Sequence, residues 1–175
     1  MKPQKAALRI FDAALRAADP EKAVLQNVSV EDGTLLIGRK RYELSRYERI
    51  FVVGAGKASA SMAKAIEKLL GKRIKSGLIN VKYGHTAKLR RIELNECGHP
   101  VPDEAGEKGA ERIEHIVRKA GAGDLLICLI SGAGLPNDML DPLSAFLTGF
   151  IRHGMSAFVQ FNTAKLRRMS ILDVD

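Results

Sequence analysis

A short apolar segment that runs into a glycine turn constrains the fold of this 175-residue chain more than any other feature. The apolar residues 51–53 are followed by Gly54 and Gly56, then by Lys57 and a helix-like stretch. This order predicts a strand, a tight turn and a helix. The N-terminus of a helix offers unpaired N–H groups and the positive end of its dipole to a phosphate or carboxylate. The turn is therefore a candidate anion site, although a plain strand-to-helix turn with a solvated lysine would show the same pattern.

Two common nucleotide-binding motifs do not fit this turn. A P-loop, G-x-x-x-x-G-K-S/T, would need glycine at 51 and Ser or Thr at 58, where the chain has Phe51 and Ala58. The dinucleotide pattern G-x-G-x-x-G matches both glycines but has Ser59 at its third position, and the next predicted strand ends at Lys82 instead of an acid for a ribose hydroxyl. The missing acid disfavours NAD as a cofactor. The basic side chain of Lys82 is compatible with the 2′-phosphate of NADP, which therefore stays open as a cofactor.

Alternating strand and helix patterns predict the fold class. An amphipathic helix over 3–18 and a β-hairpin over 28–37, with a third short strand over 41–44, precede this alternation. Strands are then predicted at 49–53, 76–81, 91–95 and 124–130, with helices at 57–70 and 103–120. Such alternation implies an α/β fold with a mainly parallel sheet and helices on its faces. Ligands of these sheets bind beyond the carboxyl ends of the strands, near a topological switch point.

Three polar or glycine-rich loops follow predicted strands, and we expect them to lie together at one edge of the sheet: 54–59, 97–106 and 131–134. His99 directly precedes two prolines that stiffen the second loop, and we expect it either to contact a substrate anion or to serve as a hydrogen-bonding spacer. Asp103 is positioned to cap the following helix. Ser131, Gly132 and Gly134 follow the most apolar strand, as a second phosphate cradle or as a simple loop.

Composition narrows the partners. Basic residues exceed acidic ones by eight, but they are spread along the chain without interleaved aromatics, which disfavours nucleic acid and favours small anionic ligands. Cys97 and Cys128 lack metal-ligand spacing, and no apolar run approaches the roughly 20 residues of a membrane span. We therefore expect a cytoplasmic protein without a membrane partner.

Three segments together resemble the type-2 glycerate kinases, the family associated with the MOFRL domain. They are VVGAGKASASMAKAIE at 52–67, GHPVPDEAGEKGAERI at 98–113 and DLLICLISGAG at 124–134. The resemblance implies a Rossmann-like N-terminal domain over 1–134, with 135–175 as a divergent or truncated helical tail and the family's second domain absent. Residues 154–163 are only faintly similar to the family's later segment.

The activity that the resemblance implies is transfer of the ATP γ-phosphoryl group to the 2-hydroxyl of D-glycerate, with ATP and Mg²⁺ as cofactors. Lys57 then corresponds to the family's active-site lysine, and Gly54, Gly56 and Ser59 shape its turn. His99 falls in the family's second loop and Ser131, Gly132 and Gly134 in its third. This third loop departs from the family's pattern, because Ala133 interrupts its glycines and Leu135-Pro136 replaces a serine.

Three functional hypotheses follow for the isolated chain. In the first, it is the N-terminal part of a glycerate 2-kinase and needs a missing half, supplied by a separately encoded partner. In the second, it is an inactive anion-binding or dimerisation module. In the third, it is an NADP-dependent hydroxypyruvate reductase, a label that some members of the family carry.

Overall fold

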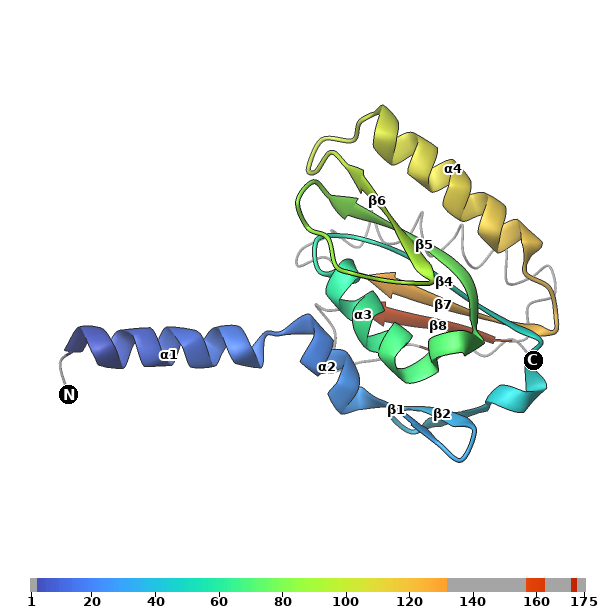
Figure 1. Cartoon of the computed structure of the whole chain (residues 1–175), viewed down its shortest axis with the longest axis horizontal. Coiled ribbons are helices and arrows are strands. Elements are labelled where there is room, and N and C mark those ends of the chain that lie inside the picture. Colours follow the sequence, from blue (N-terminus) through green and yellow to red (C-terminus); the bar gives the residue numbers. More distant parts are fainter. Residues whose placement is uncertain (1–2, 132–156, 163–170, 173–175) are drawn as a thin grey trace.

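The computed structural model describes residues 3–131, 157–162 and 171–172 of the chain. A sheet with the strand order β6-β5-β4-β7-β8-β9 forms its centre (Figure 1). Strands β4 to β8 are parallel to one another, and only β9 runs antiparallel to its neighbour β8. The elements of this unit are β4 (Arg49–Ala55), α3 (Ser59–Leu70), η2 (Gly71–Arg73), β5 (Ile74–Lys82), β6 (Ile92–Cys97), α4 (Glu104–Lys119), β7 (Asp124–Ile130), β8 (Ala157–Asn162) and β9 (Ile171–Leu172). The predicted Rossmann-like parallel sheet is confirmed.

Helices cover both faces of the sheet, as predicted. On one face, α3 packs its buried residues, among them Met62 and Ile66, against Val52, Ile79 and Ile127. On the other face, α4 contributes Val117 to a second core that includes Phe51 and Leu126. All seven residues of β7 are buried, because a central parallel strand is covered on both faces. After Asp124, the strand is therefore a continuous apolar run from 125 to 130.

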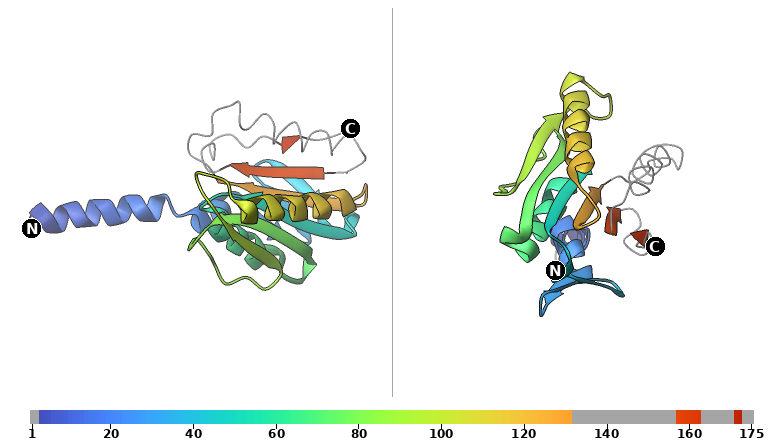
Figure 2. Two further views of the ribbon diagram at one scale, coloured as in Figure 1. Left: turned by 90° about the horizontal axis from the view of Figure 1, so that it is seen from above. Right: turned by 90° about the vertical axis from the view of Figure 1, so that its right-hand side faces the viewer.

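The N-terminal part precedes this unit. It contains α1 (Pro3–Ala17), α2 (Pro20–Asn27), the antiparallel strands β1 (Val28–Glu31), β2 (Thr34–Ile37) and β3 (Lys40–Glu43), and the short helix η1 (Leu44–Arg46). The predicted hairpin and its third strand are confirmed. Figures 1 and 2 show α1 projecting away from the rest of the chain, and none of its residues is buried. The apolar side chains of this helix, Leu8, Ile10, Phe11 and Leu15, are exposed in the described structure.

Helix α2 was not predicted. Asp19 caps it by accepting hydrogen bonds from the backbone N–H groups of Glu21 and Lys22, and Pro20 occupies its first position. An N-cap acid followed by proline at the first position is a helix-start signal. The Asp19-Pro20 pair was instead interpreted only as the end of the preceding helix.

The segment 135–175 was predicted to be a divergent or truncated helical tail. Within its described residues the chain forms the parallel strand β8 and the antiparallel strand β9, which extend the sheet beyond 134. The edge of β7 supplies the hydrogen-bonding partner for β8, with Leu125 opposite Ala157 and Ile130 opposite Asn162. The predicted helix that starts near 141 lies outside the described residues.

Candidate functional site

The topological switch point of the sheet lies at β4. The chain leaves β4 through α3 to reach β5 on one side, while β7 pairs with the other side of β4. Because β4, β5, β6 and β7 are parallel, their carboxyl ends meet at one edge. The loops after β4, β6 and β7 therefore open at the same edge, as predicted.

Gly54 and Gly56 allow β4 to pass very close to β7. A Cβ added at Gly54 would lie 2.2 Å from the Leu129 carbonyl oxygen, and one at Gly56 would lie 2.0 Å from the Ser131 carbonyl oxygen. Gly56 also has a φ of +115°, which side chains rarely adopt. Both glycines are thus required for close packing of the two strand ends.

Ser131 connects the third loop to the glycine turn. Its hydroxyl oxygen accepts a hydrogen bond of 2.7 Å from the backbone N–H of Ala58, and its own N–H donates to the Ala55 carbonyl at 3.0 Å. Since the Ser131 oxygen is already an acceptor here, its hydroxyl proton remains available to donate to a ligand at the edge.

Ser59, at the third position of the dinucleotide pattern, lies inside the protein and not on the solvent-facing side of the turn. Its side chain is fully buried, and its hydroxyl lies 2.6 Å from the Ala55 carbonyl oxygen and 3.1 Å from the Leu129 carbonyl oxygen. The hydroxyl therefore ties the start of α3 to the ends of β4 and β7. Ser59 shapes the turn, as the resemblance implies, through contacts within the protein.

The backbone donors of the turn are already partly used. The N–H of Gly56 donates to the Asn80 carbonyl at 3.0 Å, and the N–H of Ser59 donates to the Gly56 carbonyl at 3.2 Å. With Ala58 bound to Ser131, three N–H groups of the turn have partners within the protein. Lys57 adds a full positive charge that faces solvent at this edge.

Lys57 is exposed at the carboxyl end of β4, directly before α3. Within the described residues, no carboxylate pairs with its ammonium group. A cation without a partner beside a helix N-terminus attracts small anions.

The loop after β6 is anchored by Asp103. This residue caps α4 by accepting a hydrogen bond of 2.9 Å from the Gly106 N–H, and it accepts another of 2.8 Å from the Tyr83 hydroxyl. Hydrogen bonds from the backbone of Gly98 and Gly106 and from Tyr83 lower the pKa of Asp103. The predicted cap is confirmed. His99 lies on the same loop with its side chain exposed, and its peptide bond to Pro100 is cis.

Two asparagines hold the start of α4 against the sheet. The Asn80 amide donates to the Gly106 carbonyl at 3.1 Å, while the Asn95 amide donates to the Ala105 carbonyl at 2.9 Å and to Asn80 Oδ1 at 3.0 Å. Gly109 makes this approach possible, since a Cβ there would lie 2.0 Å from Asn80 Oδ1. These contacts position the loop that carries His99.

The edge therefore combines Lys57, Ser131 and the His99 loop. β6 is two strands from β4, which separates their axes by about 10 Å at the usual strand spacing. The structure places Gly54, Gly56 and Ser59 under this surface. Gly132 and Gly134 lie outside the described residues.

A metal site does not emerge from the side chains in the described ranges. They contain no cluster of three His, Cys, Asp or Glu residues that could hold an ion. Asp103 at this edge is occupied by capping and by Tyr83. The side chains of the described residues thus provide no ligand set for the Mg²⁺ that the resemblance implies.

The sequence matches a protein family described as a domain of unknown function, DUF4147, over residues 6–136. The chain belongs to the DUF4147 family. The resemblance to glycerate 2-kinases is also confirmed: over 127 residues the chain is 39% identical to a glycerate 2-kinase from Pyrococcus horikoshii, covering 73% of this chain and 28% of that protein.

Two further relatives bear on function. A putative hydroxypyruvate reductase from Agrobacterium vitis is 44% identical over 126 residues, covering 72% of this chain and 26% of that protein. A crystal structure of a glycerate kinase from Thermotoga maritima superposes with a TM-score of 0.56 at 28% identity, covering 87% of this chain and 35% of that chain. This DUF4147 chain thus spans about a quarter to a third of the length of these proteins.

Several residues of the edge were not found from the sequence. Tyr83, Asn80 and Asn95 act through contacts with α4 or its cap, across 10 to 26 positions of sequence. An asparagine in each of two strands that otherwise contain many apolar residues was the only local signal. The structure also contains no helix, among those described, that is long and apolar enough to cross a membrane.

Proposed function

We propose that this DUF4147 chain provides the Rossmann-like wall of an ATP-dependent glycerate 2-kinase. In this proposal, the γ-phosphoryl group of ATP is transferred to the 2-hydroxyl of D-glycerate at the carboxyl edge of the sheet. The observation that carries the proposal is the exposed Lys57 ammonium group at the switch point, without a carboxylate partner in the described structure and next to Ser131. The glycerate kinases among the relatives support the family of reactions.

The residues at this edge suit phosphoryl transfer. Such reactions depend mainly on positioning and on neutralising the charge of the transferred group. Lys57 would place a positive charge beside the phosphoryl oxygens, and the Ser131 hydroxyl would donate a hydrogen bond to the same anion. Because the hydrogen bonds of Ser59 and Ser131 already hold the turn, these donors need little rearrangement when the anion binds.

The full reaction needs a second wall. The relatives are three to four times as long as the matched region, so in this proposal the residues that bind the remaining parts of ATP and glycerate come from outside it. His99, on the exposed loop after β6, would face glycerate across the edge.

The test is an assay for ATP-dependent formation of 2-phosphoglycerate by the 175-residue chain. We expect ATP to raise the melting temperature of the wild-type chain but not that of Lys57→Ala. Where the second wall is supplied and product forms, we expect Lys57→Ala to lower turnover by about a hundredfold or more, the size typical of a removed electrostatic group. Lys119→Ala is the matched control, because Lys119 is exposed at the far end of α4, and it should leave turnover unchanged. No turnover together with no ATP-dependent thermal shift would refute the kinase proposal and favour an inactive anion-binding or dimerisation module.

A second candidate is an NADP-dependent hydroxypyruvate reductase. It is favoured by the name of the Agrobacterium vitis relative, a putative hydroxypyruvate reductase, and by Lys82. This lysine ends β5, the strand whose end carries the ribose-binding acid in NAD proteins. This candidate predicts NADPH oxidation in the presence of hydroxypyruvate, without any need for ATP. Unchanged NADPH absorbance under these conditions rejects it.

A further inference from the structure

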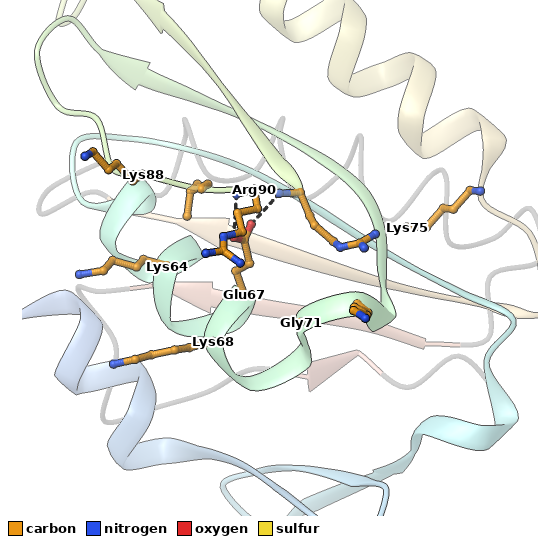
Figure 3. A pocket seen from close by; sticks show the side chains of 10 residues that line it. Lys64, Glu67, Lys68, Gly71, Lys75, Lys88 and Arg90 are labelled. Carbon is orange, nitrogen blue, oxygen red and sulfur yellow. Dashed lines mark hydrogen bonds between the residues drawn. The ribbon is translucent and has the colours of Figure 1, made fainter.

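A second cationic feature lies along α3, away from the edge that carries Lys57. It is a cavity of about 810 Å³ between α3, η2 and the segment that connects β5 to β6 (Figure 3). We call it the α3 groove. Seven basic side chains and one carboxylate, Glu67, line it. From the sequence, the excess of basic residues predicts a general preference for small anionic ligands without assigning it to these side chains.

Glu67 builds one wall of the α3 groove. Its carboxylate accepts hydrogen bonds from the backbone N–H groups of Arg90 at 2.7 Å, Arg91 at 2.9 Å and Ile92 at 3.3 Å. These bonds, of which Figure 3 draws those from Arg90 and Arg91 as dashed lines, pin the connecting segment to α3. Among the lining residues that the structure describes, the one carboxylate is thereby turned toward backbone donors and away from the cations. The same hydrogen bonds fix the backbone of the segment that carries Lys88 and Arg90.

The cations of the groove stand on two sides. Lys64, Lys68 and Lys72 occur at every fourth position along α3 and η2, which separates successive residues by about 6 Å along the axis. Lys88 and Arg90 come from the connecting segment opposite them. In Figure 3 the side chains of Lys64, Lys68 and Lys88 extend toward the same side.

The charge of this groove is only partly neutralised. Lys64 and Lys68 pair with Glu21 of α2 at 2.9 Å and 3.3 Å. Among the residues that the structure describes, no carboxylate pairs with the side chains of Lys72, Lys75, Lys88 or Arg90. Like charges repel one another at this spacing, so a multivalent anion between them would relieve the repulsion.

We propose that the α3 groove binds a small anion that carries a chain of phosphate groups. Lysine outnumbers arginine here, and lysine binds phosphate as a point charge without a required planar geometry. Protein partners need an apolar centre in their interface, whereas Leu89 is the one large apolar side chain that lines this groove. The groove therefore fits an oligophosphate better than an acidic protein.

The test is a calorimetric titration of the 175-residue chain with inorganic tripolyphosphate at low ionic strength. The chain carries Lys57→Ala, so that anion binding at the carboxyl edge does not contribute. We expect binding, and about tenfold weaker affinity when Lys72→Gln and Lys88→Gln are added. The matched control is Arg73→Gln with Lys5→Gln, which removes the same charge from exposed residues outside the groove and should change affinity less than twofold.

Two further measurements complete the test. One uses a second variant, so that the result does not depend on a single double substitution, and the other compares two sources of the phosphate chain. Arg90→Gln retains its backbone bond to Glu67 and should also weaken binding. Equal affinity for ATP and tripolyphosphate identifies the phosphate chain itself as the ligand, whereas tighter binding of ATP identifies a nucleotide. The proposal is overturned if tripolyphosphate does not bind, if both double variants lose affinity equally, or if an acidic peptide binds more tightly than tripolyphosphate.

Discussion

The ion pair between Arg49 and Asp124 should stabilise the start of the central strand pair, and Asp124→Asn tests it. Arg49 begins β4 and Asp124 begins β7, directly opposite each other. The guanidinium donates from Nε to Oδ1 at 2.9 Å and from an Nη to Oδ2 at 2.6 Å, and the Gly121 N–H donates to Oδ2 at 2.8 Å. Asparagine would keep the shape of the side chain, but it would place an NH₂ group toward donors and remove the charge.

The expected cost follows from the burial of the two partners. The Asp124 side chain is only 1% exposed, so water cannot replace its lost hydrogen bonds, whereas the Arg49 side chain is 41% exposed and can be hydrated again. We therefore expect a loss of about 2–3 kcal/mol in the free energy of unfolding, less than the cost of leaving a fully buried charge unpaired. Urea denaturation at neutral pH measures this difference. Asp12→Asn, the same change on the exposed helix α1, is the control and should change stability by less than about 0.5 kcal/mol.

The same pair predicts a pH dependence. Burial raises the pKa of Asp124, but hydrogen bonds from Arg49 and Gly121 outweigh it, so that the pKa lies below its ordinary value. A lowered pKa stabilises the folded protein above the unfolded value of about 3.9, and this stabilisation is lost as the pH falls through the folded pKa. The gap between wild type and Asp124→Asn should therefore shrink below about pH 4. A gap under about 0.5 kcal/mol at pH 7, or one that widens in acid, would refute the reasoning.

Three further changes test the packing around the carboxyl edge. Ser59→Ala should lower the free energy of unfolding by about 1–2 kcal/mol, because it removes the buried hydroxyl between the Ala55 and Leu129 carbonyl groups. Urea denaturation measures this loss, and Ser61→Ala, also in the first turn of α3, is the control. Gly109→Ala should cost about 2 kcal/mol, since its Cβ would lie 2.0 Å from Asn80 Oδ1, and weakened protection of α4 amides in hydrogen exchange would report the disturbed packing. Complete burial raises the pKa of the Cys128 thiol to about 12, so a thiol reagent should modify Cys128 only after unfolding; rapid labelling of Cys128 in native buffer would contradict this.

The predicted secondary structure agrees closely with the structure where local patterns are strong. The strand at 124–130 and the helix starting after Asp103 were predicted within one residue of β7 and α4, because a long apolar run and a capping acid are local signals. Helix α2 was missed since its start signal, Asp19-Pro20, was interpreted as the end of the helix before it. β8 was missed in favour of a helical tail, because a strand at this position depends on hydrogen bonds to β7 and not on its own pattern.

The candidate site was predicted in part. The glycine turn, Lys57 and the three loops are contiguous motifs, and their common edge follows from parallel strands. The bond from Ala58 to Ser131 joins residues 73 positions apart, and no sequence pattern links them. Similarly, the cations of the α3 groove come from segments that meet only because Glu67 holds the backbone of residues 90–92.

The sequence by itself determined most of the helices and strands of this protein, its family and the presence of a lysine on a strand-to-helix turn, because propensity, periodicity and motifs operate over a few neighbouring residues. Only the tertiary structure decided how these residues are used. It buried Ser59 between two strand ends, left Lys57 exposed and without a partner in the described ranges, and placed Ser131 against the turn. The physical reason is that burial, charge pairing and the availability of a hydrogen-bond donor depend on neighbours in space, which pairing of β4 with β7 and packing of α3 bring together from distant parts of the chain.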